Sequence, residues 1–259
     1  MELVYDVGGY DGADTARYLD MGFRVLCIEA APPLADKIRG RFKGNNRCVV
    51  LNVAVGEKDG TLPFYVFPDC GELNSFEKRP GSTEISVAVR TFRSILEEYG
   101  VPYFLKVDIE GADRHAILPL TKDTAPQFVS FEAGKRDLDL ILHLWSIGYR
   151  RFNIIRQDVH RPVTLPGPGT AKHVMWSARQ AFRLWLRSHK RLHAIARTAR
   201  SGKAGQLTGV VNSSEVNSGA PPMEIKEGWR DIDEMMHDWA ALTRSGMIES
   251  VWYDVHAAL

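Results

Sequence analysis

Three glycines stand within five residues near the start of the chain, in the stretch VYDVGGYDG from Val4 to Gly12. The stretch begins as a β-branched run that ends in an acid, and the helix-like segment 13–22 follows it. Glycine has no Cβ, so it is used where the backbone turns sharply or approaches another group closely. A strand, a glycine loop and a helix in this order predict the opening unit of an α/β sheet, with a loop that comes close to a ligand.

Strand-like and helix-like segments continue to alternate through the first 156 residues. Short apolar strands separated by helices of about 10–15 residues predict a mostly parallel, doubly wound sheet that is covered on both faces. The segment 250–259 (SVWYDVHAAL) predicts a last strand that returns to this sheet. The expected strands are 2–8, 24–30, 47–56, 59–67, 84–91, 103–111, 127–134 and 150–157, and the expected helices are 32–42, 92–100, 112–120 and 138–149.

The composition changes after residue 157, which divides the chain into three predicted parts. We predict a core over 1–157, a helical insertion over 158–249 and a final core strand over 250–259. Within the insertion, 172–200 is basic and helical, about 201–222 is a flexible linker rich in glycine, serine and asparagine, and 229–246 is a second amphipathic helix.

The basic helix carries four cations at helical spacing, and the segment from Ala171 to Gly205 holds no acidic residue. One interpretation is the solvated side of an amphipathic lid. The others are a surface that attracts an anionic substrate or a membrane surface. No RNA- or DNA-binding motif accompanies the helix, so nucleic acid is not an expected partner. The four cations are Arg179, Arg183, Arg187 and Lys190.

A glycine loop between a strand and a helix can serve NAD, FAD, a nucleotide phosphate or S-adenosylmethionine. The order Asp6-x-Gly8-Gly9-x-x-Gly12 fits no register of G-x-G-x-x-G, and no G-K-[ST] follows it, which argues against a dinucleotide and a P-loop. The remaining pattern, D-x-G-x-x-x-G, resembles the first motif of class I methyltransferases. The helix N-terminus behind the loop then lies near the carboxylate of S-adenosylmethionine. A tight turn without a ligand remains the alternative.

Two further strand ends carry candidate cofactor contacts. Glu29 ends the second strand, where a carboxylate can accept hydrogen bonds from both ribose hydroxyls, although a solvated acid is the alternative. The third strand ends at Asn52 to Ala54, which can lie along the adenine edge. The predicted cofactor-binding residues are Asp6, Gly8, Gly9, Tyr10, Gly12, Glu29, Asn52, Val53 and Ala54.

Several short stretches together resemble the FkbM-type methyltransferases: YDVGGYDG, IEAAP, NVAVGEKDGTLPFYV, NSF, SVAVRTF and FLKVDIEGADRHAI. The resemblance covers roughly residues 3–156, and the closing WYDVHA fits it as well. It implies a class I, Rossmann-like methyltransferase sheet with a C-terminal antiparallel strand and S-adenosylmethionine as the methyl donor. It also implies a hydroxyl acceptor on a sugar, glycan or natural product. The sequence departs from the family at Tyr10, where Asn is common, and at Pro119, where Gly is frequent.

Methyl transfer to an alcohol needs a group that removes a proton, which a carboxylate or a divalent metal can provide. Asp108 and Glu110 are two residues apart, so they face one side if their strand persists that far, and Glu132 ends the next strand. These three are the predicted catalytic residues, and Asp108 and Glu132 are the candidate ligands of Mg²⁺. Alternatively, the first two cap the following helix, and Glu132 pairs with Lys135 or Arg136 on the surface.

The roles of two residues in the last predicted strand remain open. His256 and Asp254 share one face of that strand and can face the site, although a satisfied core histidine is the more ordinary expectation for His256. His115 falls within a predicted helix, where a packed or solvated position is expected.

The sequence therefore predicts an S-adenosylmethionine-dependent O-methyltransferase. The alternative is a non-catalytic cofactor-binding Rossmann module that contacts an anionic partner through the basic helix, and a dehydrogenase ranks behind both. Three scattered cysteines, no signal-peptide pattern and no long apolar run predict a reducing, cytoplasmic setting.

Overall fold

The computed structural model describes residues 1–67, 78, 80–109, 111–134, 136–157, 160–163, 165, 175, 221–245, 248 and 252–259. The predicted basic helix with Arg179, Arg183, Arg187 and Lys190, and nearly all of the predicted linker, lie outside these residues.

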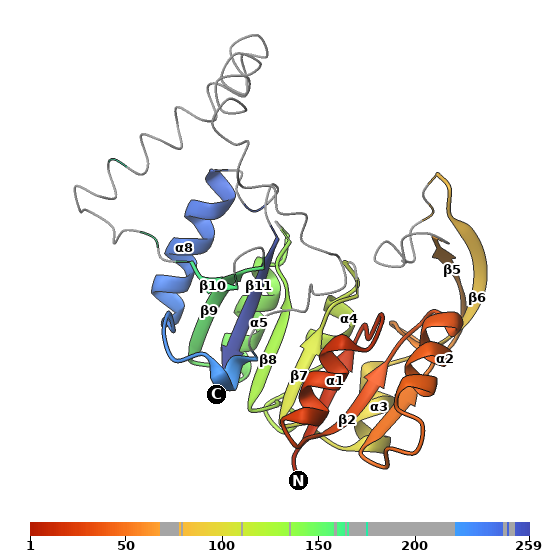
Figure 1. The fold of residues 1–259 in the computed structure, drawn as a ribbon. Coiled ribbons are helices and arrows are strands. Elements are labelled where there is room, and N and C mark those ends of the chain that lie inside the picture. The colour runs from red at the N-terminus through yellow and green to blue at the C-terminus, as the bar shows by residue number, and fades with distance from the viewer. Residues whose placement is uncertain are drawn as a thin grey trace, which may run out of the picture.

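The main sheet has the strand order β10-β9-β11-β8-β7-β1-β2-β3 (Figure 1). Neighbours among β3, β2, β1, β7 and β8 pair in parallel, whereas β11 lies antiparallel between β8 and β9. The predicted doubly wound sheet and its antiparallel C-terminal strand are therefore confirmed. The strands are β1 Leu3–Val7, β2 Arg24–Ile28, β3 Cys48–Leu51, β7 Phe104–Val107, β8 Phe128–Glu132, β9 Arg151–Arg156, β10 Arg161–Pro162 and β11 Tyr253–Ala258.

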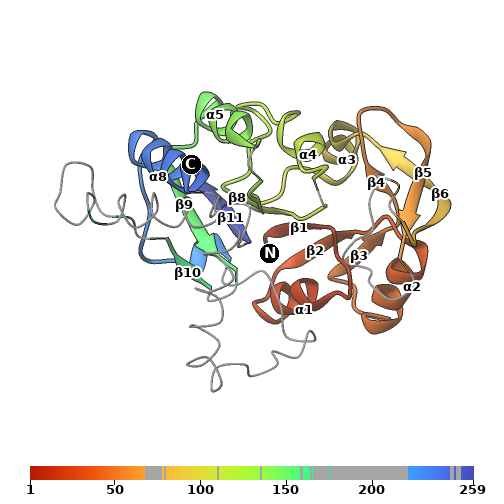
Figure 2. The same cartoon turned by 90° about the horizontal axis from the view of Figure 1, so that it is seen from above.

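Helices cover both faces of this sheet, because alternate residues of the buried strands are apolar on each side (Figure 2). Helices α1 and α2 lie on one face, and α3, α4, α5 and α8 pack on the other, where the larger core is found. The helices are α1 Ala13–Asp20, α2 Pro32–Arg41, α3 Phe92–Tyr99, α4 Arg114–Ile117, α5 Leu138–Ile147 and α8 Ile232–Arg244, with a short 3-10 helix η3 at Pro222–Glu224.

The register of the sheet places polar residues side by side on the α1 face. Asp6, Lys106, Ser130, His256 and Asn153 follow one another across β1, β7, β8, β11 and β9. Directly paired residues of neighbouring strands point to the same face of a sheet. A buried polar row therefore crosses the sheet just below the carboxyl ends of its parallel strands.

A second sheet of three strands branches from the first, in the order β4-β6-β5. Its strands are β4 Ala54–Val55, β5 Gly60–Val66 and β6 Thr83–Arg90. The single strand predicted over 47–56 is therefore divided, since β3 belongs to the main sheet and β4 to the small one. Residues 52 and 53 form the crossing between the sheets, and their backbone leaves the β3 direction there.

The second amphipathic helix that the sequence predicts is present as α8, and the Asp231 side chain caps it by accepting a hydrogen bond from the Glu234 amide. Its apolar side joins the large core through Met235, Trp239 and Leu242. The described end of the predicted insertion therefore packs on the sheet. No helix in the described part of the chain is both long and apolar enough to cross a membrane.

Candidate active site

The glycine loop 8–12 connects β1 to α1 across the carboxyl ends of the parallel strands. The amides of Gly8 and Gly9 donate hydrogen bonds to the carbonyl oxygen of Ile28, at 2.9 and 3.2 Å. Gly8 has φ +89°, and a Cβ at this position would overlap the backbone carbonyl of Asp108. Glycine at position 8 is thus required first by contacts within the chain, because no side chain fits between β1 and β7.

The loop and the end of β2 are joined by the Glu29 carboxylate. Its two oxygens accept hydrogen bonds from the amides of Tyr10, at 2.9 Å, and of Ala31, at 2.8 Å. Tyr10 has φ +48°, an unusual conformation for a residue with a Cβ, and this hydrogen bond helps to stabilise it. Burial raises the pKa of Glu29, whereas the two amide hydrogen bonds favour its ionised form. Each oxygen keeps a lone pair for a further donor.

The predicted adenine edge lies beside Glu29. The Asn52 side-chain amide donates hydrogen bonds to the carbonyl oxygens of Glu29, at 2.7 Å, and Ala30, at 3.1 Å. Val53 and Ala54 are buried, the first in the large core and the second in the core of the small sheet. Asn52 therefore braces the turn after β2.

A buried ion cluster lies behind the loop. The Lys106 ammonium is 2.8 Å from the Asp14 carboxylate and 3.5 Å from those of Asp6 and Asp108, and the Thr15 hydroxyl donates to Asp6 at 2.6 Å. Burial lowers the pKa of Lys106, but the three carboxylates outweigh burial and raise it well above its usual value. Burial also raises the pKa of Asp6. The cluster holds more acids than bases.

The predicted catalytic acids occupy neighbouring strand ends. Asp108 directly follows β7, and its side chain is 34% exposed, whereas Glu132 is the last residue of β8 and half-buried. Strand β7 ends at Val107, so the expected strand does not continue to position 110, and Glu110 lies outside the described residues. Asp113, rather than Asp108, is the residue at the cap of α4, so the capping alternative does not apply to Asp108.

Two more acids lie around Asp108, and sequence reasoning did not select either as catalytic. Asp254 is the Cα partner of Glu132 across the β11–β8 pairing, and the Gln157 side-chain amide donates to its Oδ1 at 2.7 Å. Burial raises the pKa of Asp254 to about 8, and the charge of Asp108 adds to the rise. Burial and the same charge raise the pKa of Asp113 to about 7. No local sequence pattern indicates these raised pKa values, because they depend on which strands become neighbours in the sheet.

The residues of the loop fit S-adenosylmethionine on two observations. The ion cluster holds three carboxylates around one ammonium, so a cationic ligand beside it improves the charge balance, whereas the pyrophosphate of NAD worsens it. Glu29 offers acceptor lone pairs for hydroxyl donors next to the loop. A metal site finds no such support, because the described residues contain no group of three His, Cys, Asp or Glu side chains that could hold an ion.

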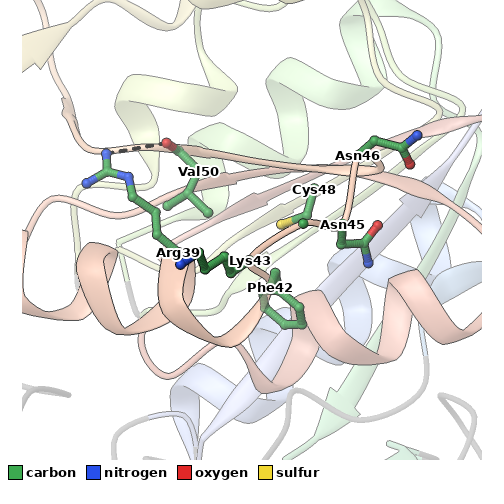
Figure 3. A pocket seen from close by; sticks show the side chains of 8 residues that line it. Arg39, Phe42, Lys43, Asn45, Asn46, Cys48 and Val50 are labelled. Carbon is green, nitrogen blue, oxygen red and sulfur yellow. Dashed lines mark hydrogen bonds between the residues drawn. The ribbon is translucent and has the colours of Figure 1, made fainter.

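A surface pocket lies on the far side of α2, away from these strand ends (Figure 3). Its volume is about 450 Å³, and its lining includes Arg39, Phe42, Lys43 and Cys48. The Arg39 guanidinium is already paired with Asp36 at 2.8 Å and reaches the Val50 carbonyl oxygen. The pocket borders the α2–β3 loop, at the amino end of β3, which is the wrong edge of the sheet for a ligand of this fold class.

A comparison with family models matches residues 6–151 to the methyltransferase FkbM domain. This match covers the glycine loop, Glu29, the small sheet and the ends of β7 and β8. No curated protein matches the chain.

Comparison with solved structures finds several methyltransferases. The precorrin-6y C5,15-methyltransferase of Geobacter metallireducens aligns over 60% of this chain and 69% of its own, at 10% identity and a TM-score of 0.38. A TehB-like SAM-dependent methyltransferase of Corynebacterium glutamicum aligns over 63% and 73%, at 10% identity and a TM-score of 0.35. Phosphoethanolamine N-methyltransferase 2 of Haemonchus contortus, in complex with S-adenosyl-L-methionine, aligns over 99% and 48%, at 9% identity and a TM-score of 0.38.

Proposed function

Because the chain belongs to the FkbM methyltransferase family and has a class I, Rossmann-like sheet, we propose that it transfers a methyl group from S-adenosylmethionine to a hydroxyl group. We further propose a sugar, glycan or natural product as the acceptor. The observation that carries this proposal is the row of strand ends, in which the Gly8–Glu29 region lies beside Asp108, and Glu132 follows on the next strand.

We assign a different role to each group of residues in this row. Glu29 binds the ribose hydroxyls, and the α1 N-terminus lies near the carboxylate of the donor. The acids of the ion cluster favour a cation at the loop. The bound donor supplies an activated methyl group on a sulfonium sulfur. The acids at the strand ends beyond the glycine loop face the acceptor, and one of them takes its hydroxyl proton.

The charge of the described strand ends favours an uncharged acceptor at the reacting position. Asp108 and Glu132 stand at the ends of neighbouring strands, ~5 Å apart, so an anionic group there is repelled. An anionic portion of the acceptor, or a membrane surface, would instead contact Arg179, Arg183, Arg187 and Lys190, as the sequence predicts. The reducing, cytoplasmic setting belongs to the same proposal.

The test has two steps on the purified full chain. Calorimetry first measures the binding of S-adenosylhomocysteine and of NAD, and the proposal expects binding of the first alone. Methyl transfer is then measured as release of S-adenosylhomocysteine, with mass spectrometry of the products. The acceptor panel contains the uncharged methyl glycosides of glucose, galactose, mannose and rhamnose, with their 6-phosphates or sulfates as charged controls. Comparable binding of NAD would refute the donor, and transfer confined to the charged controls would refute the acceptor class.

A further inference from the structure

The carboxyl group of Asp254 has one oxygen in use and one without a partner. Gln157 donates to Oδ1, whereas Oδ2 is buried and has no hydrogen-bond partner among the described residues. A buried carboxyl oxygen without a partner is costly, and proteins retain such groups where a ligand or water completes them. The oxygen therefore marks a place where a donor binds.

The position of Asp254 fits an acceptor. It lies on the same face and in the same row as Gly8, Asp108 and Glu132, three strands away from the glycine loop. Three strand spacings amount to ~14 Å, which leaves the cofactor half of the edge free. Trp252, which precedes β11 at this edge, is 69% exposed, so solvent reaches the edge within two residues of the buried Asp254.

Asp254 and Asp108 also differ in their surroundings. The Asp108 carboxylate already lies 3.5 Å from the Lys106 ammonium, whereas Oδ2 of Asp254 has no hydrogen-bond partner among the described residues. The groups that face Asp254 are Asp108 and Lys106 on β7, Asp14 on α1, Glu132 on β8, Gln157 after β9 and His256 on its own strand. Burial keeps His256 neutral by lowering its pKa to about 3, so the effects that oppose the raised pKa of Asp254 are the Gln157 hydrogen bond and the Lys106 charge.

We propose that Asp254 is the catalytic base that takes the proton of the acceptor hydroxyl, and that Gln157 is the residue that positions it. This inference rests on the proposed function. The acceptor oxygen forms its bond to the methyl carbon as the carbon–sulfur bond breaks and leaves its electron pair on sulfur. The hydroxyl proton passes to Oδ2 of the ionised Asp254 and from there to solvent. The class of acceptor is an uncharged alcohol.

The kinetic test uses the full chain, S-adenosylmethionine and the methyl glycoside of the panel that turns over fastest. The wild type should show a kcat that rises with pH through a midpoint of about 8. Asp254→Asn should lower kcat by about 10²–10⁴-fold and remove this midpoint, while the affinity for S-adenosylhomocysteine stays unchanged. Gln157→Met should move the midpoint to higher pH, because the lost hydrogen bond favoured the ionised carboxyl.

A matched control and a second measurement keep the test decisive. Asp238→Asn removes an equally buried carboxylate, which is paired with Arg230 at 2.6 Å on the opposite side of the sheet, and should leave the midpoint in place. Carbon-13 NMR of the Asp254 carboxyl needs no acceptor and should show a protonated group at pH 6 in the complex with S-adenosylhomocysteine. An Asp254 that is ionised at pH 6, or an Asp254→Asn variant with the wild-type pH profile, overturns the inference. A wild type that does not bind S-adenosylhomocysteine overturns the proposed function instead.

Discussion

The two halves of the sheet edge are built in different ways. The half over β1 and β2 takes its residues from a short piece of chain between Gly8 and Glu29, and backbone amides donate to both oxygens of the buried Glu29 carboxylate. The half over β7, β8 and β11 gathers Asp108, Glu132 and Asp254 from distant parts of the chain, and one oxygen of Asp254 has no partner among the described residues. Hydrogen bonds within a short segment hold the first half, whereas the second half brings together carboxyl groups from distant strands.

The difference has a physical origin. A loop that must pass between two strands is specified by its own φ angles, so a pattern of glycines can encode it locally. A raised pKa is specified by burial and by neighbouring charges, which come from strands that are far apart in the sequence. The buried Lys106 connects the two halves, because its ammonium reaches Asp6 and Asp14 on one side and Asp108 on the other.

The largest expected effect comes from breaking the junction at Gly8. We expect Gly8→Ala to lower the free energy of unfolding by more than about 4 kcal/mol, because the added Cβ overlaps the carbonyl of Asp108 and neither strand can move. Gly22→Ala is the matched control, since Gly22 has φ +93° and open space around it, and should cost only about 1–2 kcal/mol. Urea titration measures both. Equal losses in the two variants would contradict the close contact of β1 and β7.

The next prediction tests whether Lys106 connects the two halves of the sheet edge. Lys106→Met leaves the carboxylates of Asp6, Asp14 and Asp108 without their cation, and should lower the free energy of unfolding by about 3–4 kcal/mol at pH 7. Replacing the exposed Lys37 by Met is the control and should change stability little. Adding Asp14→Asn to Lys106→Met should recover part of the loss in the same urea titration. A loss without any recovery would point to packing rather than to charge.

The sequence predicted well those parts of the fold that depend on local patterns. The alternation of apolar strands and helices led to the parallel sheet, and the final apolar run led to β11. The division of residues 47–56 between β3 and β4 was missed, since the run from Val49 to Val55 is continuously strand-like and only the small sheet explains the break. The helix expected over 112–120 is shorter in the structure, where α4 has four residues and begins directly after Asp113.

The residues of the candidate site also differ in whether the sequence alone could predict them. Asp6, the glycines and Glu29 could be selected from the first 29 residues, because strand, loop and helix follow each other directly. The sequence alone left the role of Asp254 open. Its role depends on the hydrogen bond from Gln157 and on the strand that pairs with β11 in the sheet. A sequence does not state which strand a C-terminal segment will join, so this part of the site required the structure.

The third effect is a pH dependence of stability confined to the acceptor half. The folded pKa of Asp254, about 8, exceeds the ordinary aspartate pKa of 3.8, so its contribution to stability is present at low pH and is lost as pH rises toward 8. We expect the wild type to lose about 3 kcal/mol more than Asp254→Asn between pH 5 and pH 8. Urea titrations of both proteins across this range measure the difference. Parallel stability curves would mean that Asp254 is ionised in the folded protein.

The most direct test of whether the sheet edge has separate donor and acceptor halves measures the binding of S-adenosylhomocysteine to two variants by calorimetry. Glu29→Ala should weaken binding by about 2 kcal/mol, the scale of a hydrogen bond to a charged group, because the proposed contact with the ribose would be lost. Asp254→Asn should bind S-adenosylhomocysteine as tightly as the wild type, because its carboxyl lies three strands away. Equal weakening in the two variants, or NAD binding as tight as that of S-adenosylhomocysteine, would contradict a sheet edge divided into a donor half and an acceptor half.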